Sequence, residues 1–153
     1  MNIFHKRQGQ MDISICYFYT DTINNFMPLL ANDDLKLIVI QSLQYLVRNE
    51  FVKIYGYVIM PNHIHILWYL LKLNGKESAA GSFAKYTAHQ FKKYLKNHQP
   101  SLLEKYRSGK GDRQYQFWKR DPLAIPVSSE SILIQKLEYI HQNPVREKWA
   151  LSK

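Results

Sequence analysis

The sequence predicts an α+β fold of ferredoxin-like character, an antiparallel β-sheet with helices packed on it. Segments rich in β-branched and aromatic residues alternate with segments of helical spacing in the order β, α, β, β, α, and short extended pieces and a final helix follow. Two of the strand-like segments are separated by a two-residue turn. At 153 residues the chain is expected to form a single domain over residues 1–153, long enough to bury a core.

The first strand and the first helix are predicted near the N-terminus. Asp12–Tyr19 mixes β-branched and aromatic residues and leads into Thr20-Asp21, which indicates a strand followed by a loop. Asn32 is a favourable N-cap with two acidic residues after it, and apolar residues then recur at helical spacing. We therefore expect a helix that ends near Arg48.

The centre of the sheet is predicted to be a pair of strands, Phe51–Ile59 and Asn62–Leu71. Only Met60-Pro61 separates them, so a tight turn joins two antiparallel neighbours. Helical spacing resumes over Ser82–Asn97, after a break in the pattern at Asn74-Gly75-Lys76.

Shorter elements are predicted in the remainder of the chain. We expect a short helix at Ser101–Arg107 and extended pieces at Gln114–Trp118 and Ala124–Val127. The last helix begins near Ser128 or Ser129 and ends at Asn143-Pro144, because a residue before proline is pushed out of the helical region.

The charge balance points to a polyanionic partner. There are 21 Lys and Arg against 12 Asp and Glu, which gives a net charge of +9 and an isoelectric point near 9.6. Nucleic acid is the leading candidate for such a partner, and a solvated basic surface without a ligand is the alternative.

The helix predicted at Ser82–Asn97 concentrates part of this charge. At 100° per residue, one side carries the basic residues Lys85, His89, Lys92 and Lys96. The other side carries Phe83, Tyr86, Gln90 and Tyr94. An ordered lysine row can follow a phosphate backbone, although such a row is also typical of a solvated helix face.

Cysteine content and hydropathy indicate a cytoplasmic protein without a membrane anchor. The single cysteine, Cys16, cannot form an intrachain disulfide, and its place in an apolar run predicts a buried structural thiol. The N-terminal segment has no apolar core of a signal peptide, and no stretch offers the roughly 18 apolar residues of a membrane span.

A histidine pair is the first candidate for chemistry. His63 and His65 lie two residues apart in a predicted strand, so both imidazoles point to the same face, while Ile64, Ile66 and Trp68 point into the core. This arrangement could hold a metal ion, or it could be two structural or surface histidines. The absence of a nearby cysteine and of a His-Glu-x-x-His motif argues against a closed zinc site or a zinc protease.

A tyrosine in the last helix is the second candidate. The stripe that faces the core consists of Leu133, Leu137 and Ile140. Tyr139 lies about 100° from the centre of that stripe, at its rim, and shares its face with Gln135 and Asn143, one turn away on either side. His141 points nearly the opposite way. Tyr139 could equally be an ordinary rim residue, and Asn143 could simply end the helix.

Two sequence blocks resemble the signature motifs of the single-tyrosine HUH transposases. The blocks are VIMPNHIHILW, which contains the histidine pair, and LEYIHQNPVR, which contains Tyr139. They resemble the group of REP-associated tyrosine transposases in particular, in order as well as in spacing. The FWKRDP block from Phe117 and the start around Ile15 are similar to the same family, so the likeness extends over about Ile13 to Trp149.

The resemblance implies a role for each matched residue. It implies an HUH fold in which His63 and His65 bind a divalent cation, Mg²⁺ or Mn²⁺, and Tyr139 is the nucleophile. Asn143 occupies the place of a polar third metal ligand, where some relatives carry glutamine, so helix capping stays open for this residue. The activity implied is cleavage and rejoining of DNA through a 5′-phosphotyrosine intermediate.

The resemblance also implies the partner. Relatives act on single-stranded DNA near short hairpins, and they work either as monomers or as homodimers. The residues expected to contact DNA are Lys85, Lys92, Lys96 and Arg146. Many relatives continue beyond the point that corresponds to Lys153, so we expect a C-terminus that is truncated relative to theirs.

Two other functions fit parts of the sequence. A ferredoxin-like sheet with aromatic residues and positive charge also describes a non-catalytic module that binds single-stranded nucleic acid, as in RNA-recognition domains. The aromatic strand motif of those domains is not found in the sequence. A zinc-dependent hydrolase could use His63 and His65, but the sequence shows no evident third strong ligand or general base for it.

Overall fold

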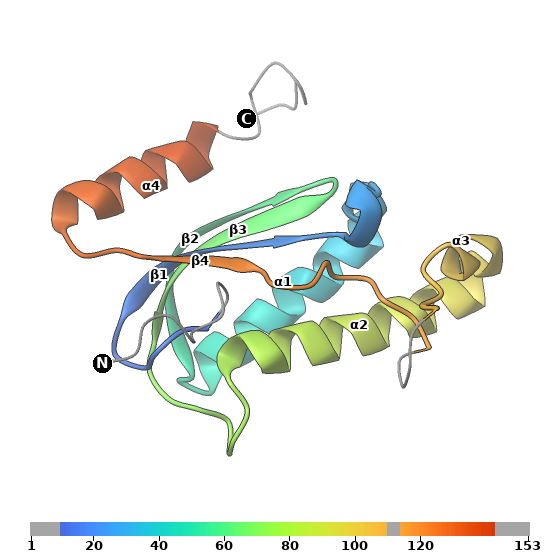
Figure 1. Ribbon diagram of the computed structural model, residues 1–153, viewed down its shortest axis with the longest axis horizontal. Coiled ribbons are helices and arrows are strands. Elements are labelled where there is room, and N and C mark those ends of the chain that lie inside the picture. The colour runs from blue at the N-terminus through green and yellow to red at the C-terminus, as the bar shows by residue number, and fades with distance from the viewer. Residues whose placement is uncertain (1–9, 110–113, 143–153) are drawn as a thin grey trace.

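The sheet of the molecule has four strands in the order β2-β3-β1-β4, and all neighbours are antiparallel. The computed structural model describes residues 10–109 and 114–142. The elements are β1 (Cys16–Thr22), α1 (Asp33–Arg48), β2 (Val52–Met60), β3 (His63–Leu70), α2 (Ala79–His98), α3 (Pro100–Glu104), β4 (Leu123–Pro126) and α4 (Glu130–Gln142). Helices α1 and α2 cover one face of the sheet, and α4 lies over the other (Figure 1). The predicted α+β class with an antiparallel sheet is confirmed.

Helix α1 begins and ends where the sequence predicts. The Asn32 side chain accepts hydrogen bonds from the backbone N–H of Asp34 (2.8 Å) and of Leu35 (3.3 Å). These bonds satisfy two of the N–H groups that the first turn of a helix leaves without a partner. The predicted N-cap is therefore confirmed.

Strands β2 and β3 form the predicted hairpin, and β3 sends alternate side chains to the two faces of the sheet. Ile64, Ile66 and Trp68 are no more than 1% exposed and pack under α1 and α2. The predicted inward orientation of these three residues is confirmed, and it places His63 and His65 on the face toward α4.

The first strand differs from the prediction at both ends. It begins at Cys16 and continues through Thr20 and Asp21, which the sequence pattern assigned to a loop. The polar pair remains in the strand because Thr20 lies opposite both His65 and Leu123, and the Asp21 side chain is buried beside Tyr19. Tertiary pairing therefore overrides the low strand propensity of these residues.

Helix α2 begins three residues earlier than predicted, because Ser78 accepts a hydrogen bond from the Gly81 N–H (3.0 Å) and caps it. The buried residues of α2 are Ala79, Phe83, Thr87, Phe91 and Leu95. Tyr86, which helical periodicity placed on the side of Phe83, is 43% exposed. The residues buried at i, i+4 and i+8 leave Tyr86 at the edge of the packed stripe.

The segment predicted as the extended piece Gln114–Trp118 is anchored mainly by side chains. It forms only isolated bridges, such as Ile23 with Trp118, and its aromatic residues enter the core beside α2. The Trp118 Nε1–H donates to the hydroxyl of Thr87 (2.9 Å), and that hydroxyl donates to the Phe83 carbonyl (2.8 Å). Successive aromatic residues that are both buried do not fit the alternation of a regular strand.

The face toward α4 is covered by a smaller cluster, built on Phe18, Val58, Met60, Leu67 and Ile140. Gly56 allows close packing here, because a Cβ at this position would lie 3.1 Å from Leu137 Cδ2. Cys16 is half-buried at the edge of the same cluster. None of the helices in the described part of the chain is both long and apolar enough to cross a membrane.

Candidate active site

The two predicted histidines lie side by side on β3. Their ring centroids are 4.9 Å apart, and both rings face α4. Pairing on both sides fixes their positions, because β3 is a central strand: His65 lies opposite Thr20 of β1 and Val58 of β2. The strand register thus produces the two-imidazole surface that the His-x-His spacing predicts.

Each histidine is held through the same ring nitrogen. Nδ1 of His65 lies 2.8 Å from Oγ1 of Thr20, and Nδ1 of His63 lies 2.7 Å from Oδ1 of Asn62. The Asn62 amide oxygen can only accept, and the threonine hydroxyl can accept in the same way, which favours the tautomer with the proton on Nδ1. In that tautomer Nε2 bears the lone pair, as in metal-ligating histidines oriented by an outer hydrogen bond.

Tyr139 of α4 lies against His65 of the same chain. Its ring centroid is 5.3 Å from that of His65, with the planes at 74°, and the side chain is half-buried. The predicted rim position is therefore confirmed. Gln135 and His141 are exposed. The predicted ligand Asn143 and the predicted DNA contact Arg146 lie outside the described residues.

Phe18 of β1 packs against both His65 and Tyr139. Its ring stacks on His65 with centroids 5.0 Å apart and meets the Tyr139 ring edge-on at 5.8 Å. The ammonium of Lys136, one turn before Tyr139, lies 4.9 Å from the Phe18 centroid. The sequence analysis missed Phe18, Thr20 and Lys136. The spacing Lys136-x-x-Tyr139 on one helix face was the available signal for the lysine.

The donor set fits a divalent cation in chemistry but is incomplete within the described residues. Two imidazoles on one face suit Mn²⁺ and, less well, Mg²⁺, which prefers oxygen donors. Among residues 10–109 and 114–142, no three His, Cys, Asp or Glu side chains gather at a spacing suited to a metal ion. The family resemblance implies Asn143, an amide, as the third ligand, and this residue lies outside the described residues.

The three predicted DNA-binding lysines of α2 are not part of this site. Lys85, Lys92 and Lys96 belong to the helix that covers the opposite face of the sheet (Figure 1). Lys85 pairs with Glu77 at 3.7 Å, and Lys92 donates to the side-chain oxygen of Gln114 at 2.9 Å. The structure therefore separates this lysine row from the histidines and the tyrosine.

A buried carboxyl group lies on the far side of β1. The carboxyl oxygens of Asp21 accept the Tyr19 hydroxyl (3.1 Å) and the Thr22 N–H (3.0 Å). Burial raises the pKa of Asp21 to about 7, although both hydrogen bonds act in the other direction. Burial, together with the neighbouring Asp21, also raises the pKa of Tyr19 well above its usual value. Because Asp21 was predicted to lie in a loop, the burial of its carboxyl group was not predicted.

The fold and the site together define a class of domain, a ferredoxin-like sheet on which a strand-borne histidine pair faces a helix-borne tyrosine. Solved structures of transposases share this fold. A REP-associated tyrosine transposase bound to a REP hairpin superposes with a TM-score of 0.62 at 16% sequence identity, over 97% of this chain and 76% of that one. A candidate transposase from Deinococcus radiodurans R1 gives a TM-score of 0.50 at 15% identity, over 97% of this chain and all of that one.

These likenesses establish the fold. The sequence itself matches no known protein-family profile and no curated protein. The likeness in fold extends over nearly the whole chain, whereas the sequence resemblance to REP-associated tyrosine transposases is carried mainly by two short blocks.

Proposed function

We propose that the protein is a metal-dependent endonuclease and strand transferase for single-stranded DNA, a transposase that acts through Tyr139. The observation that carries the proposal is the convergence of His63, His65 and Tyr139 within one chain, with ring centroids 4.9 and 5.3 Å apart. Two segments that are 74 residues apart in the sequence are brought together by the docking of α4 on the sheet. Neither segment alone distinguishes this function from a structural role.

The proposed cofactor is Mn²⁺ or Mg²⁺, held by the histidine pair. Nε2 of His63 and Nε2 of His65 are the donors that the Nδ1 hydrogen bonds favour. Asn143 is the proposed third ligand. When bound, the cation supplies Lewis-acid polarisation of the scissile phosphate.

The proposed reaction is a transesterification at phosphorus. The Tyr139 oxygen forms a bond to the phosphorus and loses its proton, while the bond from phosphorus to the 3′ oxygen breaks. The departing 3′ oxygen keeps the electron pair and takes up a proton, which leaves a 5′-phosphotyrosine and a free 3′-hydroxyl. The number of phosphodiester bonds is conserved, so a later attack by a 3′-hydroxyl can rejoin the strand without ATP.

Lys136 is proposed to assist Tyr139 electrostatically. It lies one turn before the tyrosine on α4, half-buried, with its ammonium against the Phe18 ring that Tyr139 also contacts. A positive charge attracts a phosphate. Lys136 therefore favours the approach of the scissile phosphate to Tyr139.

The proposed substrate is single-stranded DNA that forms hairpins. The structural neighbour with the TM-score of 0.62 is bound to a REP hairpin, and this chain carries a net charge of +9. Backbone neutralisation by Lys and Arg makes such binding strongly dependent on salt. Because His63, His65 and Tyr139 converge within one chain, the proposed reaction does not require a second copy, and a homodimer is also compatible with the proposal.

The test is the formation of a covalent protein–DNA adduct. The wild type is incubated with a labelled hairpin-bearing single strand and Mn²⁺, and adducts are resolved on a denaturing gel. Tyr139→Phe is expected to abolish the adduct, because it removes the attacking oxygen and keeps the ring packed on His65 and Phe18. Tyr55→Phe, at an exposed tyrosine of β2, is the matched control and should react like the wild type.

Replacement of both histidines separates catalysis from binding. His63→Ala with His65→Ala is expected to abolish adducts while much of the salt-sensitive DNA affinity remains, because that affinity is electrostatic. An adduct that survives Tyr139→Phe would refute the nucleophile. Loss of DNA binding together with cleavage would instead indicate a structural histidine pair, and binding by a wild type that forms no adduct would favour the non-catalytic module.

A further inference from the structure

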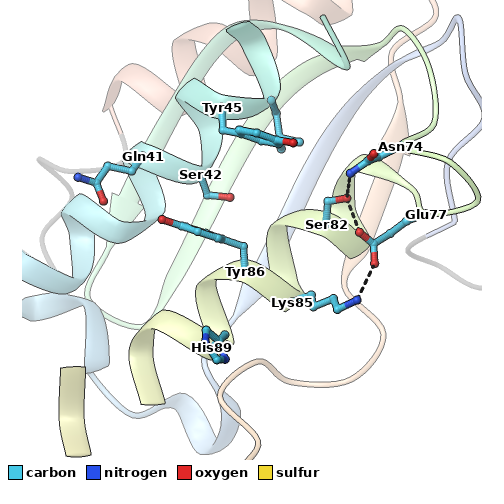
Figure 2. A pocket seen from close by; sticks show the side chains of 10 residues that line it. Gln41, Ser42, Tyr45, Asn74, Glu77, Ser82, Lys85, Tyr86 and His89 are labelled. Atoms are coloured by element: carbon cyan, nitrogen blue, oxygen red, sulfur yellow. Dashed lines mark hydrogen bonds and ion pairs between the residues drawn. The ribbon is translucent and has the colours of Figure 1, made fainter. Parts of the chain in front are cut away.

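A pocket of about 510 Å³ lies between α1 and α2, on the face of the sheet opposite the histidines (Figure 2). One wall is formed by α1, with Gln41, Ser42, Tyr45 and Leu46, and the first half of α2 forms the other, with the turn at Asn74–Glu77 closing one end. This volume lies within the range of roughly 300–1,000 Å³ that is usual for small-molecule sites. The pocket is large enough for a planar ring and its substituents.

Two tyrosines define the shape of this pocket. Tyr45 of α1 and Tyr86 of α2 lie on opposite sides of it, with the hydroxyl of Ser42 between them (Figure 2). Both rings are substantially exposed, at 49% and 43%. Tyr45 is supported from behind by the Phe51 ring, with centroids 6.2 Å apart. Two exposed rings on either side of a hollow favour a flat, aromatic ligand.

Polar groups surround the aromatic pair. The Gln41 amide and the Ser42 hydroxyl, which can each donate and accept hydrogen bonds, lie beside the rings. At the other end Glu77 accepts the Ser82 hydroxyl (2.6 Å) and pairs with Lys85, so its charge is already compensated. Such groups can read the edge of a heterocycle without imposing a net negative charge on the pocket.

The exit from the pocket is basic. Lys85 and His89 line its edge, and the same side of α2 continues with Lys92 and Lys96, the row that the histidine site leaves unused. A basic helix face that begins at an aromatic pocket combines the two elements of single-strand binding, a track for phosphates and a platform for bases. A peptide ligand would have no comparable need for this combination.

We propose that this pocket binds an unpaired base of single-stranded DNA, stacked between Tyr45 and Tyr86, while the adjoining phosphates follow the basic side of α2. The choice of DNA rests on the proposed function, but the pocket takes no part in the reaction of Tyr139. It gives the protein a second contact with its substrate strand, on the opposite side of the sheet from the site of cleavage.

The first test compares strands that have the same phosphates and different bases. Affinity is measured by fluorescence polarisation for a labelled oligo(dT) and for an abasic strand of equal length, at one salt concentration and with EDTA. Wild type should prefer oligo(dT), and Tyr86→Ala should weaken its binding roughly tenfold, as expected for the loss of one base stack, with little change for the abasic strand. Tyr86→Phe should restore the preference, and Tyr55→Ala is the matched control for an exposed tyrosine.

The second test does not depend on a variant that folds. An oligonucleotide with 5-iododeoxyuridine is photocrosslinked to the wild type, and the attached peptides are mapped by mass spectrometry. Crosslinks at Tyr45 or Tyr86 are expected. Crosslinks confined to other segments, or an equal affinity of the wild type for oligo(dT) and the abasic strand, would overturn the proposal.

The two proposals fail separately. If the protein forms adducts at Tyr139 but shows no base preference, the proposed function stands and the base-binding role of the pocket is refuted. If binding depends on the base and on Tyr86 but no hairpin strand gives an adduct, the pocket proposal stands and the nuclease activity is refuted.

Discussion

The two faces of the sheet differ in what covers them. Under α1 and α2 lies a continuous apolar core that includes Trp68, Phe83 and Phe91, each fully buried. Over the other face α4 contributes a single buried residue, Ile140, and otherwise half-buried or exposed side chains. The first face supplies most of the burial that stabilises the fold. The second leaves Tyr139 and His63 partly exposed, beside the buried ring of His65.

Both faces are built by the same strand, so the difference can be tested at adjacent positions. Ile66 and Leu67 of β3 are both completely buried, one under the helices and the other under α4. Ile66→Ala is expected to lower the free energy of unfolding by about 4 kcal/mol, because the rigid core cannot close the cavity. Leu67→Ala should cost about 2 kcal/mol, because α4 can settle into the space. Urea denaturation of both variants measures the difference.

The yield of the Tyr139 adduct should fall more in Leu67→Ala than in Ile66→Ala, the opposite of the order expected for stability. Leu67→Ala shifts the support beneath α4 and should lower the yield of the Tyr139 adduct, whereas Ile66→Ala should retain it at temperatures where the variant is folded. Equal losses of stability in the two variants would show that the α4 face is packed as rigidly as the helix face, and would contradict the comparison.

Sequence reasoning was most successful where one local pattern decides the structure. The Asn32 cap, the hairpin of β2 and β3, and the inward orientation of Ile64, Ile66 and Trp68 follow from local hydrogen bonding or from the two-residue period of a strand. The same period placed His63 and His65 on one face, and helical spacing placed Tyr139 at the rim of α4.

The features that could not be predicted from the sequence are those fixed by contacts between segments that lie far apart in the chain. Thr20 and Asp21 look like loop residues until β1 is paired on both sides, and only the register of β1 with β3 brings the Thr20 hydroxyl to His65. Tyr86 and Tyr45 belong to separate helices, so the pocket between them has no signature in either segment. The packing of α2 on the side away from α4 likewise separates the lysine row from the histidines.

The buried carboxyl of Asp21, on the face covered by α1 and α2, makes the stability of the fold depend on pH. In the unfolded chain this group ionises near pH 4, and in the folded chain burial raises its pKa to about 7. Between these values the folded state keeps a proton that the unfolded state has released, so this contribution to stability falls as the pH rises. By about pH 8 the loss is nearly complete, on the order of 4 kcal/mol, because the pKa of Asp21 differs by about three units between the two states.

Asp21→Asn should remove that dependence. The variant is expected to be more stable than the wild type at pH 8, and the difference should shrink toward zero at pH 4, in urea titrations at both values. Asp33→Asn, at a carboxyl that is 94% exposed, is the control and should shift stability by no more than about 0.5 kcal/mol at either pH. A wild type that gains as much stability as Asp21→Asn on going from pH 4 to pH 8 would contradict the buried carboxyl.

On the α4 face we expect a smaller effect, which concerns the orientation of the His65 ring and not the stability of the fold. Thr20 positions His65 through the contact of 2.8 Å between its hydroxyl and Nδ1. Thr20→Val keeps the shape of the side chain and removes that contact, so the ring is free to adopt the other tautomer. We expect Mn²⁺ to bind about tenfold more weakly, as is usual when an outer hydrogen bond to a metal-ligating histidine is lost.

The measurement is a titration of free Mn²⁺ followed by electron paramagnetic resonance, which reports binding without any DNA. Thr20→Ser restores a hydroxyl at the same position and should recover most of the affinity, which a loss of packing alone would not allow. Because Thr20 acts on His65 and not on the phenol of Tyr139, a saturating concentration of Mn²⁺ should return the adduct yield of Thr20→Val toward that of the wild type. An adduct yield that stays low at saturation would place the hydroxyl in the reaction itself, and an unchanged affinity would mean that Thr20 does not orient the metal site.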